Sequence, residues 1–246
     1  MMDRLPLVTA HTGCEGTPEN SLESLRAGLE AGADTVEIDV RGTRDCSVVL
    51  MHDDYVEYEG QRRAVDELTL SEITDALSPP AILLEEAFDA FAAEESTLNL
   101  DLKDDICIEP TVELIRRYGL NERVIITGCD AGRAATVRRV GPELPVLLNV
   151  GLEDAEVARR SYQEFADEIC RRAIESGCCG LNVPYALCRS ELVRYARYRY
   201  LPVSVWTVDD ESTMLDMAGM GVDSITTYRP KALARLLAEE QRRSSA

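Results

Sequence analysis

The stretch TVEIDVRGTRDCSVVLMH, from Thr35 to His52, contains two β-rich runs, Thr35–Val40 and Ser47–His52, separated by about six residues. A crossover between parallel strands needs about a dozen residues or more, so the second run cannot be the next strand of a parallel sheet. We expect it to fold back on the first run as an antiparallel hairpin arm. The arm would return His52 to the upper end of its partner strand.

Further β-rich runs alternate with helical patterns along the rest of the chain. They are Leu5–His11, Leu98–Lys103, Val124–Thr127, Val146–Val150, Gly180–Val183, Val203–Val208 and Ser224–Thr227. Alternating strands and helices predict a parallel sheet covered by helices. With the arm set aside, eight parallel strands are left, the number in a TIM (β/α)8 barrel.

The chain has 246 residues, a length that suits one barrel domain spanning residues 1–246. We expect the polar, turn-rich region from about 55 to 80 to form a short insertion above the barrel mouth. Helices are expected at roughly Leu84 to Ala93 and from Lys231 to about Arg242. A single long helix is expected between about Asp154 and Ser176, with Gly177 as its stop signal.

The chain is strongly acidic, with a formal net charge of −19. Such a field repels nucleic acid and anionic membrane surfaces, so neither is an expected partner. The sequence shows no export signal and no apolar run long enough to span a bilayer, so we expect a cytoplasmic protein without stable membrane insertion. The oligomeric state stays open.

The basic residues are almost all arginine, since Lys103 and Lys231 are the two lysines. Abundant carboxylates with little lysine suggest a salt-loving, halophilic source, in which salt screens self-repulsion. The alternative is an acidic, arginine-biased proteome.

Carboxylates lie near the ends of two predicted strands. Alternation places Glu37, Asp39 and Arg41 on one face, and Asp101 and Lys103 on one face of another strand. Three carboxylates, Glu37, Asp39 and Asp101, form an oxygen-only ligand set that suits Mg²⁺ or Ca²⁺. The alternative is a buried salt-bridge layer with Lys103 and Arg41. The cysteines form no Cys-x-x-Cys pair, so a zinc site is not indicated.

Both histidines of the chain, His11 and His52, close apolar runs beside these acids. A lone histidine at a strand end is more often structural, but a pair of them suits proton transfer to and from reacting oxygens. Lys103 would supply a fixed positive charge for a phosphoryl oxygen. A nearby Thr17-Pro18-Glu19-Asn20 segment also suits a plain helix start, with Thr17 as the cap.

A series of short motifs occurs in a fixed order from Leu5 to Pro230. They are His11-Thr12-Gly13, Pro18-Glu19-Asn20, Glu37-Ile38-Asp39, His52-Asp53, Asp101-Leu102-Lys103, Trp206-Thr207, Gly221-Val222-Asp223 and Thr227-Tyr228-Arg229-Pro230. Taken together, the series resembles the glycerophosphodiester phosphodiesterase family.

The resemblance implies a TIM-barrel phosphodiesterase that needs a divalent cation and acts on a small-molecule phosphodiester. It implies catalytic roles for His11 and His52, with Lys103 contacting the phosphate. Metal ligation would fall to Glu37, Asp39 and Asp101, and substrate binding to Trp206.

The chain departs from the family pattern at three motif positions. Thr12 replaces a phosphate-binding arginine, Asp101 replaces a longer glutamate, and Tyr228 replaces an aspartate. Loss of an arginine removes a charge-assisted phosphate contact. We therefore consider Arg41, just past the predicted strand Thr35–Val40, as a substitute that reaches the phosphate. The alternative is a hairpin arginine paired with nearby acids.

The sequence thus favours hydrolysis of a glycerophosphodiester to an alcohol and glycerol phosphate, by way of a cyclic phosphate intermediate. One histidine would act as base and the other as acid, in an order that stays open. At the positions where it departs from the family pattern, the chain also resembles the sphingomyelinase D-like phospholipases. An enzyme of that kind would release the cyclic phosphate itself. A third alternative is a non-catalytic barrel that binds phosphodiesters.

Overall fold

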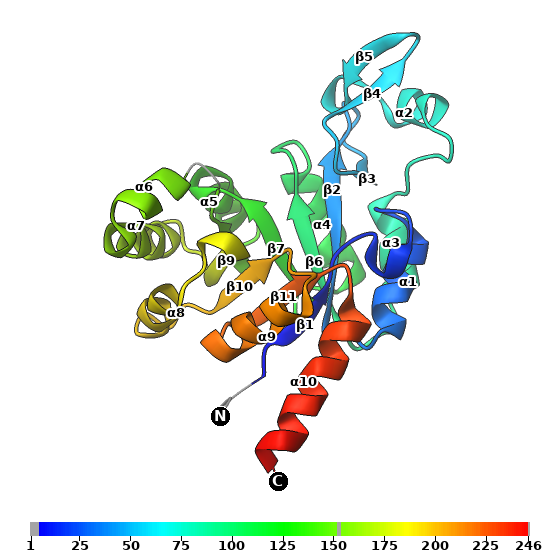
Figure 1. Ribbon diagram of the computed structural model, residues 1–246. Helices are drawn as coiled ribbons and strands as arrows, with labels where there is room; N and C mark the ends of the chain where they lie inside the picture. Colours follow the sequence, from blue (N-terminus) through cyan, green and yellow to red (C-terminus); the bar gives the residue numbers. More distant parts are fainter. Residues whose placement is uncertain (1–4, 152–153, 246) are drawn as a thin grey trace.

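The computed structural model describes residues 5–151 and 154–245 (Figure 1). Within these ranges, eight parallel strands form a closed barrel, because β1 pairs with both β2 and β11. The barrel strands are β1 (Leu7–Ala10), β2 (Thr35–Gly42), β6 (Thr97–Leu102), β7 (Val124–Cys129), β8 (Val146–Asn149), β9 (Gly180–Pro184), β10 (Val203–Trp206) and β11 (Ser224–Thr227). The predicted TIM barrel is confirmed.

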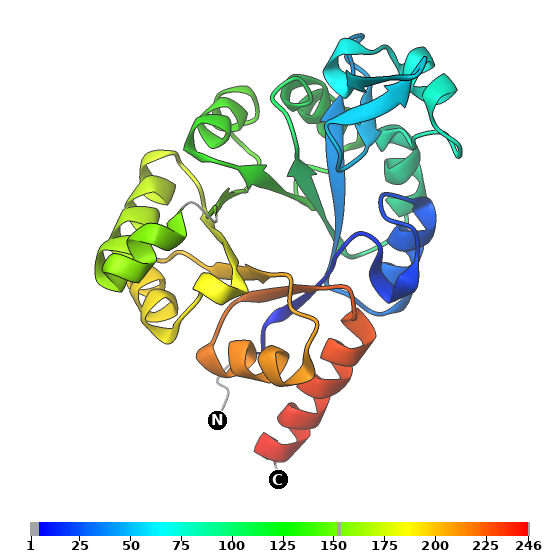
Figure 2. The same cartoon turned by 45° about the horizontal axis from the view of Figure 1, so that its top comes forward.

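Helices surround the ring of strands, as Figure 2 shows from the upper end of the barrel. They are α1 (Leu22–Glu30), α3 (Leu84–Phe91), α4 (Ile108–Tyr118), α5 (Ala131–Val140), α6 (Ala155–Arg160), α7 (Tyr162–Glu175), α8 (Ser190–Arg197), α9 (Glu211–Met220) and α10 (Pro230–Ser245).

Helix α4 shows how sequence periodicity places these helices. Ile108, Val112 and Ile115 are buried and recur at helical spacing, which gives the helix one apolar face. The helix ends at Gly119, which has a φ of +67°. This left-handed conformation costs glycine little and closes the last turn.

The hairpin arm is confirmed. Strand β3 (Val48–Leu50) runs antiparallel to β2, with Val40 opposite Leu50 and Gly42 opposite Val48. The arm therefore extends the sheet on the outside of the barrel and is not a ninth barrel strand.

The insertion that follows the arm has its own fold. A hairpin of β4 (Tyr55–Tyr58) and β5 (Gln61–Ala64) precedes α2 (Leu70–Ala76). Buried apolar side chains from the arm and the insertion form a small separate cluster, made of Val49, Val56, Val65, Leu68 and Ile73. Figure 1 shows this unit standing above the barrel mouth.

The prediction of one long helix from Asp154 to Ser176 is wrong. The segment forms α6 and α7, and it breaks at Ser161, whose backbone is extended (φ −152°, ψ 105°). The Ser161 side chain accepts a hydrogen bond from the backbone N–H of Glu164, so it caps α7. The helical pattern of apolar residues continues across this break and hides it. Gly177 does end the segment, with a φ of +74°.

In the part of the chain that the structure describes, none of the helices combines the length and the apolar character that crossing a bilayer requires.

Candidate active site

The three predicted ligands converge at the carboxyl ends of β2 and β6. Asp39 and Asp101 are paired across the two strands, and Glu37 lies two residues before Asp39. Strand alternation therefore directs all three side chains to the barrel interior. One carboxylate oxygen from each residue lies within 4.8 Å of the other two.

Each carboxylate is held by a hydrogen-bond donor. The backbone N–H of Thr12 donates to Glu37 (2.9 Å), and the Asn20 side-chain amide donates to Asp39 (2.9 Å). The Thr127 hydroxyl donates to Asp101 (2.6 Å). These donors fix the directions of the carboxylates before any ligand binds.

The charges of the cluster are strongly coupled. Burial raises the pKa of Glu37 well above its usual range, and the negative charges of Asp39 and Asp101 raise it further. Burial also acts to raise the pKa of Asp39, but the charge and hydrogen bond of Lys103, together with the hydrogen bond from Asn20, lower that pKa overall. The Lys103 ammonium lies 2.8 Å from Asp39 and 2.5 Å from Asp101. Burial opposes the charge of Lys103, but these two carboxylates raise its pKa, so it stays protonated.

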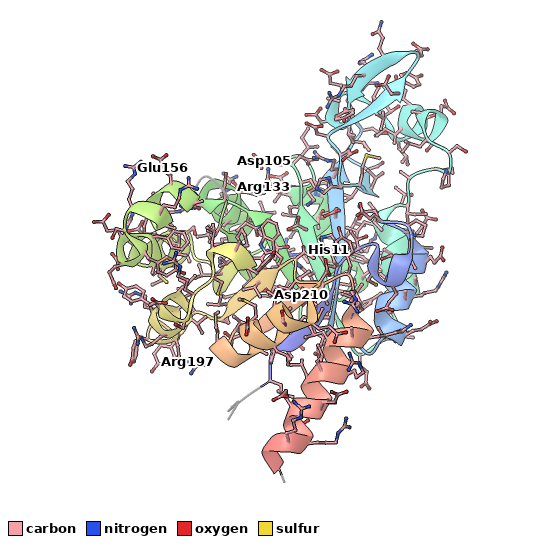
Figure 3. The ribbon with its side chains drawn as sticks, viewed as in Figure 1. His11, Asp105, Arg133, Glu156, Arg197 and Asp210 are labelled. Atoms are coloured by element: carbon pink, nitrogen blue, oxygen red, sulfur yellow. The ribbon has the colours of Figure 1, made fainter. Side chains whose placement is uncertain are left out.

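His11 follows β1 and lies against the cluster (labelled in Figure 3). Its Nδ1 lies 2.8 Å from the carbonyl oxygen of Thr12 and 3.6 Å from a Glu37 oxygen. Because a carbonyl only accepts, Nδ1 carries the proton in this hydrogen bond, and Nε2 is left for proton exchange. The Tyr228 ring packs against the imidazole, with ring centroids 4.3 Å apart.

His52 lies beyond the end of the arm. Its Nδ1 is 3.1 Å from Asp53, and its side chain is 62% exposed, against 20% for His11. Both histidines line one cavity of about 390 Å³, together with Lys103, Trp206 and the three carboxylates. The structure thus brings these predicted site residues together.

Arg41 is the exception. It is not among the residues that line this cavity. Its Nε–H donates to the His52 carbonyl (3.0 Å), and its guanidinium lies 3.6 Å from Asp104. The pairing of β2 with β6 ends at Val40, so Arg41 lies past the barrel rim, where its neighbours are the arm and Asp104. This arrangement corresponds to the alternative of a hairpin arginine paired with an acid.

The helix start near the cavity also differs from the prediction. Helix α1 begins at Leu22 and is capped by Ser21, not by Thr17. Asn20 instead adopts a positive φ of +52° and bonds Asp39 twice, through its side-chain amide and its side-chain oxygen. The segment before α1 is therefore part of the site.

Thr12 does not take over the role of the arginine that it replaces. Its side chain is buried, and its hydroxyl accepts a hydrogen bond from the Asn20 backbone N–H (2.6 Å). Thr12 therefore stabilises the loop between β1 and α1, whose Thr12 N–H and Asn20 amide donate to Glu37 and Asp39. Among the described residues that line the cavity, Lys103 is the one lysine or arginine.

Sequence reasoning missed several polar residues in the cavity wall. Thr127, Asn149 and Asn182 line it from three further strands, and Asn149 accepts hydrogen bonds from Gly128 N–H (2.9 Å) and Asn182 (3.3 Å). All three lie at or near the carboxyl ends of predicted strands, and this position was the signal that would have found them.

The chain has a closed (β/α)8 barrel with a cavity of titratable groups at the carboxyl ends of its strands. This is the arrangement of TIM-barrel enzymes. Residues 11–232 match the model of the glycerophosphoryl diester phosphodiesterase family. The chain belongs to this family and is a phosphodiesterase.

Individual relatives and solved structures are similar over most of their length. A glycerophosphodiester phosphodiesterase of Caldanaerobacter subterraneus subsp. tengcongensis is 28% identical, with 94% of this chain and 97% of the relative covered. A putative glycerophosphoryl diester phosphodiesterase of Silicibacter pomeroyi superposes with a TM-score of 0.82 at 23% identity, covering 97% and 95% of the two chains. An Oleispira antarctica phosphodiesterase, solved with its product sn-glycerol-3-phosphate, gives 0.78 at 24% identity, covering 95% and 97%.

Proposed function

We propose that this cavity hydrolyses a glycerophosphodiester to an alcohol and glycerol phosphate, with the help of a bound divalent cation. One observation carries the proposal. Three carboxylate oxygens within 4.8 Å of one another open into the same cavity as both histidines and Lys103. A purely structural salt-bridge layer gives no reason for both histidines of the chain to lie there.

The donor set fits a hard cation such as Mg²⁺ or Ca²⁺, since it offers carboxylate oxygens and neither thiolate nor imidazole. The cavity wall carries the carboxylates of Glu19, Glu37, Asp39 and Asp101 against one lysine, so on its own it repels an anionic diester. Held by Glu37, Asp39 and Asp101, the cation would offset this charge, polarise a phosphoryl oxygen and lower the pKa of a bound hydroxyl.

The two histidines suit the proton transfers. One takes the proton from the 2-hydroxyl of the glycerol as that oxygen attacks phosphorus, and the other protonates the departing alcohol. In both imidazoles Nδ1 lies near an oxygen, Thr12 O for His11 and Asp53 Oδ1 for His52. Each ring is thereby oriented with Nε2 left for the reaction.

Lys103 places a positive charge beside the phosphate, where negative charge grows in the transition state. Trp206 lines the same cavity and would contact the substrate. Arg41 would position His52, whose carbonyl oxygen accepts a hydrogen bond from its Nε–H.

The proposed reaction has two steps. In the first, the bond from phosphorus to the 2-oxygen forms and the bond to the alcohol breaks, which leaves a cyclic phosphate. In the second, water adds its oxygen to phosphorus and its proton to the 2-oxygen, which opens the ring. An enzyme that stopped after the first step would be the sphingomyelinase D-like lyase.

Phosphorus NMR of glycerophosphocholine turnover tests the proposal directly. The protein is stripped with a chelator and then given Mg²⁺ or Ca²⁺, and we expect glycerol phosphate to accumulate only after the cation is restored. Asp101→Asn should abolish this recovery. Asp105→Asn is the matched control, since Asp105 is an exposed acid paired with Arg133.

A cyclic phosphate that persists would identify the lyase. Absence of turnover with either cation, at low and at molar salt, would overturn the proposal and favour a binding barrel.

A further inference from the structure

A second hollow lies directly beside the catalytic cavity. It has a volume of about 380 Å³, within the usual range for small-molecule sites. Glu19 and His52 line both hollows, so the two hollows meet at these residues. We call this second hollow the side groove.

The walls of the two hollows differ in chemistry. The catalytic cavity is lined mainly by carboxylates, amides and hydroxyls. Asn20, Ser21 and Asp53 join Glu19 and His52 on the polar side of the side groove. The rest of its wall is mostly apolar, and the residues that give it this character include Met51, Leu77, Pro79, Pro80, Ala81 and Ile82. Apolar surface of this kind favours a ligand with little hydrogen-bonding capacity.

The groove is preformed. The backbone N–H of Leu50 donates to the carbonyl oxygen of Ile82 (2.8 Å), and Val49 forms a β-bridge with Leu83. Leu77 and Ala81 also pack against the small apolar cluster of the insertion. These contacts attach the groove wall to the hairpin arm that carries His52, so binding there requires little ordering of the chain.

We propose that the side groove binds an aliphatic chain carried by the phosphodiester substrate. This inference rests on the proposed function, since the polar end of the substrate occupies the catalytic cavity. The chain passes Glu19 and His52 and lies along the apolar wall formed by the insertion. The natural substrate is then an amphiphilic glycerophosphodiester, and the insertion selects for it.

Two kinds of substrate carry such a chain. It is attached either to the first carbon of the glycerol, as in a lysophospholipid, or to the alcohol that departs. Both leave the 2-hydroxyl of the glycerol free to attack phosphorus, so neither changes the chemistry of the reaction.

Three substrates test the inference, each used below its micelle concentration. They are glycerophosphocholine, its 1-octanoyl derivative and glycerophospho-1-octanol. Each methylene that leaves water for the groove should raise kcat/KM by up to about fourfold. We expect at least about a tenfold preference for one octyl-bearing substrate, mainly through a lower KM, since the chain is bound equally in the ground and transition states. The preferred substrate shows which end of the diester carries the chain.

Two substitutions close the groove in different ways. Ala81→Trp fills it, and Pro80→Glu, at an exposed position on its rim, adds a charge. Either should reduce the octyl preference to about twofold or less. Gln61→Trp is the control, because Gln61 is an exposed residue of the insertion outside the groove, and the preference should persist. Turnover of glycerophosphocholine shows that a variant is folded. If Ala81→Trp does not turn over glycerophosphocholine, the octyl preference of Pro80→Glu tests the groove assignment.

The failures are distinguishable. A wild-type protein that cleaves none of the three substrates contradicts the proposed function itself. One that cleaves glycerophosphocholine but shows no octyl preference, or keeps the preference in Pro80→Glu, overturns only the groove assignment.

Discussion

The Lys103 ammonium lies 2.8 Å from the Asp39 carboxylate in the wall of the catalytic cavity. The lysine therefore occupies part of the space that a cation would share with Asp39 and Asp101. Lysine and metal compete for these carboxylates, while both present positive charge to the phosphate.

We expect Lys103→Ala to lower kcat by about 10²- to 10³-fold, the usual cost of removing a preorganised charge contact. Metal affinity should stay the same or rise, because a competing ammonium is gone. Steady-state kinetics and calorimetric metal titration measure the two effects. Lys231→Ala is the matched control, since that lysine pairs loosely with Glu15 at 3.9 Å. A variant that loses metal binding together with activity would contradict this division of roles.

The Thr127 hydroxyl lies 2.6 Å from an Asp101 oxygen and 2.8 Å from Asn99 Oδ1, so its single O–H is shared between these two acceptors. Thr127→Val removes these bonds at similar volume and should weaken metal affinity or activity by about 10- to 100-fold, as expected for a group that orients a ligand. Thr127→Ser keeps the hydroxyl and should recover most of the loss. Equal behaviour of the two variants would show that the hydroxyl is not what matters.

Tyr228 packs on His11 and donates through its hydroxyl to Glu19 (3.2 Å). We expect Tyr228→Ala to lower kcat by about tenfold, because an aromatic pair contributes about 0.5–1.5 kcal/mol and the imidazole loses its support. Tyr228→Phe retains the ring contact and should stay within about threefold of the wild type. If Phe is as damaging as Ala, the bond to Glu19 carries the effect instead.

The kinetics of Arg41→Ala distinguish between two roles of Arg41, positioning of His52 and contact with the phosphate. If it positions His52 through the carbonyl bond, Arg41→Ala should lower kcat by about tenfold with little change in KM, because small displacements of a catalytic group are costly. If it contacts the phosphate, KM should rise as well. Arg44→Ala on the same arm is the control, since its partner is Glu72 (3.0 Å). Unchanged activity in Arg41→Ala would remove both roles.

The net charge of −19 predicts a marked effect of salt on stability. We expect the thermal midpoint to rise steadily from dilute buffer to about 1 M KCl, where the screening length falls to about 3 Å. Equal osmolality in sucrose is the control for solvent exclusion. A midpoint that is indifferent to KCl would contradict the expectation of a salt-loving source.

The barrel and the cluster of Glu37, Asp39 and Asp101 could be predicted from the sequence because both depend on local periodicity. The short gap between Val40 and Ser47 forces an antiparallel arm, whatever the rest of the chain does. Alternation and the common register of β2 and β6 then bring Asp39 and Asp101 together.

Other features depend on where an element ends in space, which alternation does not encode. Alternation along β2 places Arg41 on the same face as Glu37 and Asp39, but Arg41 lies beyond the last residue of β2 that pairs with β6. The break at Ser161 falls inside a continuous helical pattern, so only its capping bond reveals it. The side groove is lined by Leu77 and by turn residues such as Pro80, whose position follows from packing against the arm.

Anomalous diffraction from crystals soaked in Mn²⁺ would locate the cation relative to the three carboxylates. We expect one strong peak about 2.0–2.6 Å from carboxylate oxygens of Glu37, Asp39 and Asp101, with the Lys103 ammonium displaced from Asp39. A metal-activated enzyme whose peak lies away from these three carboxylates would show that they do not form the catalytic metal site.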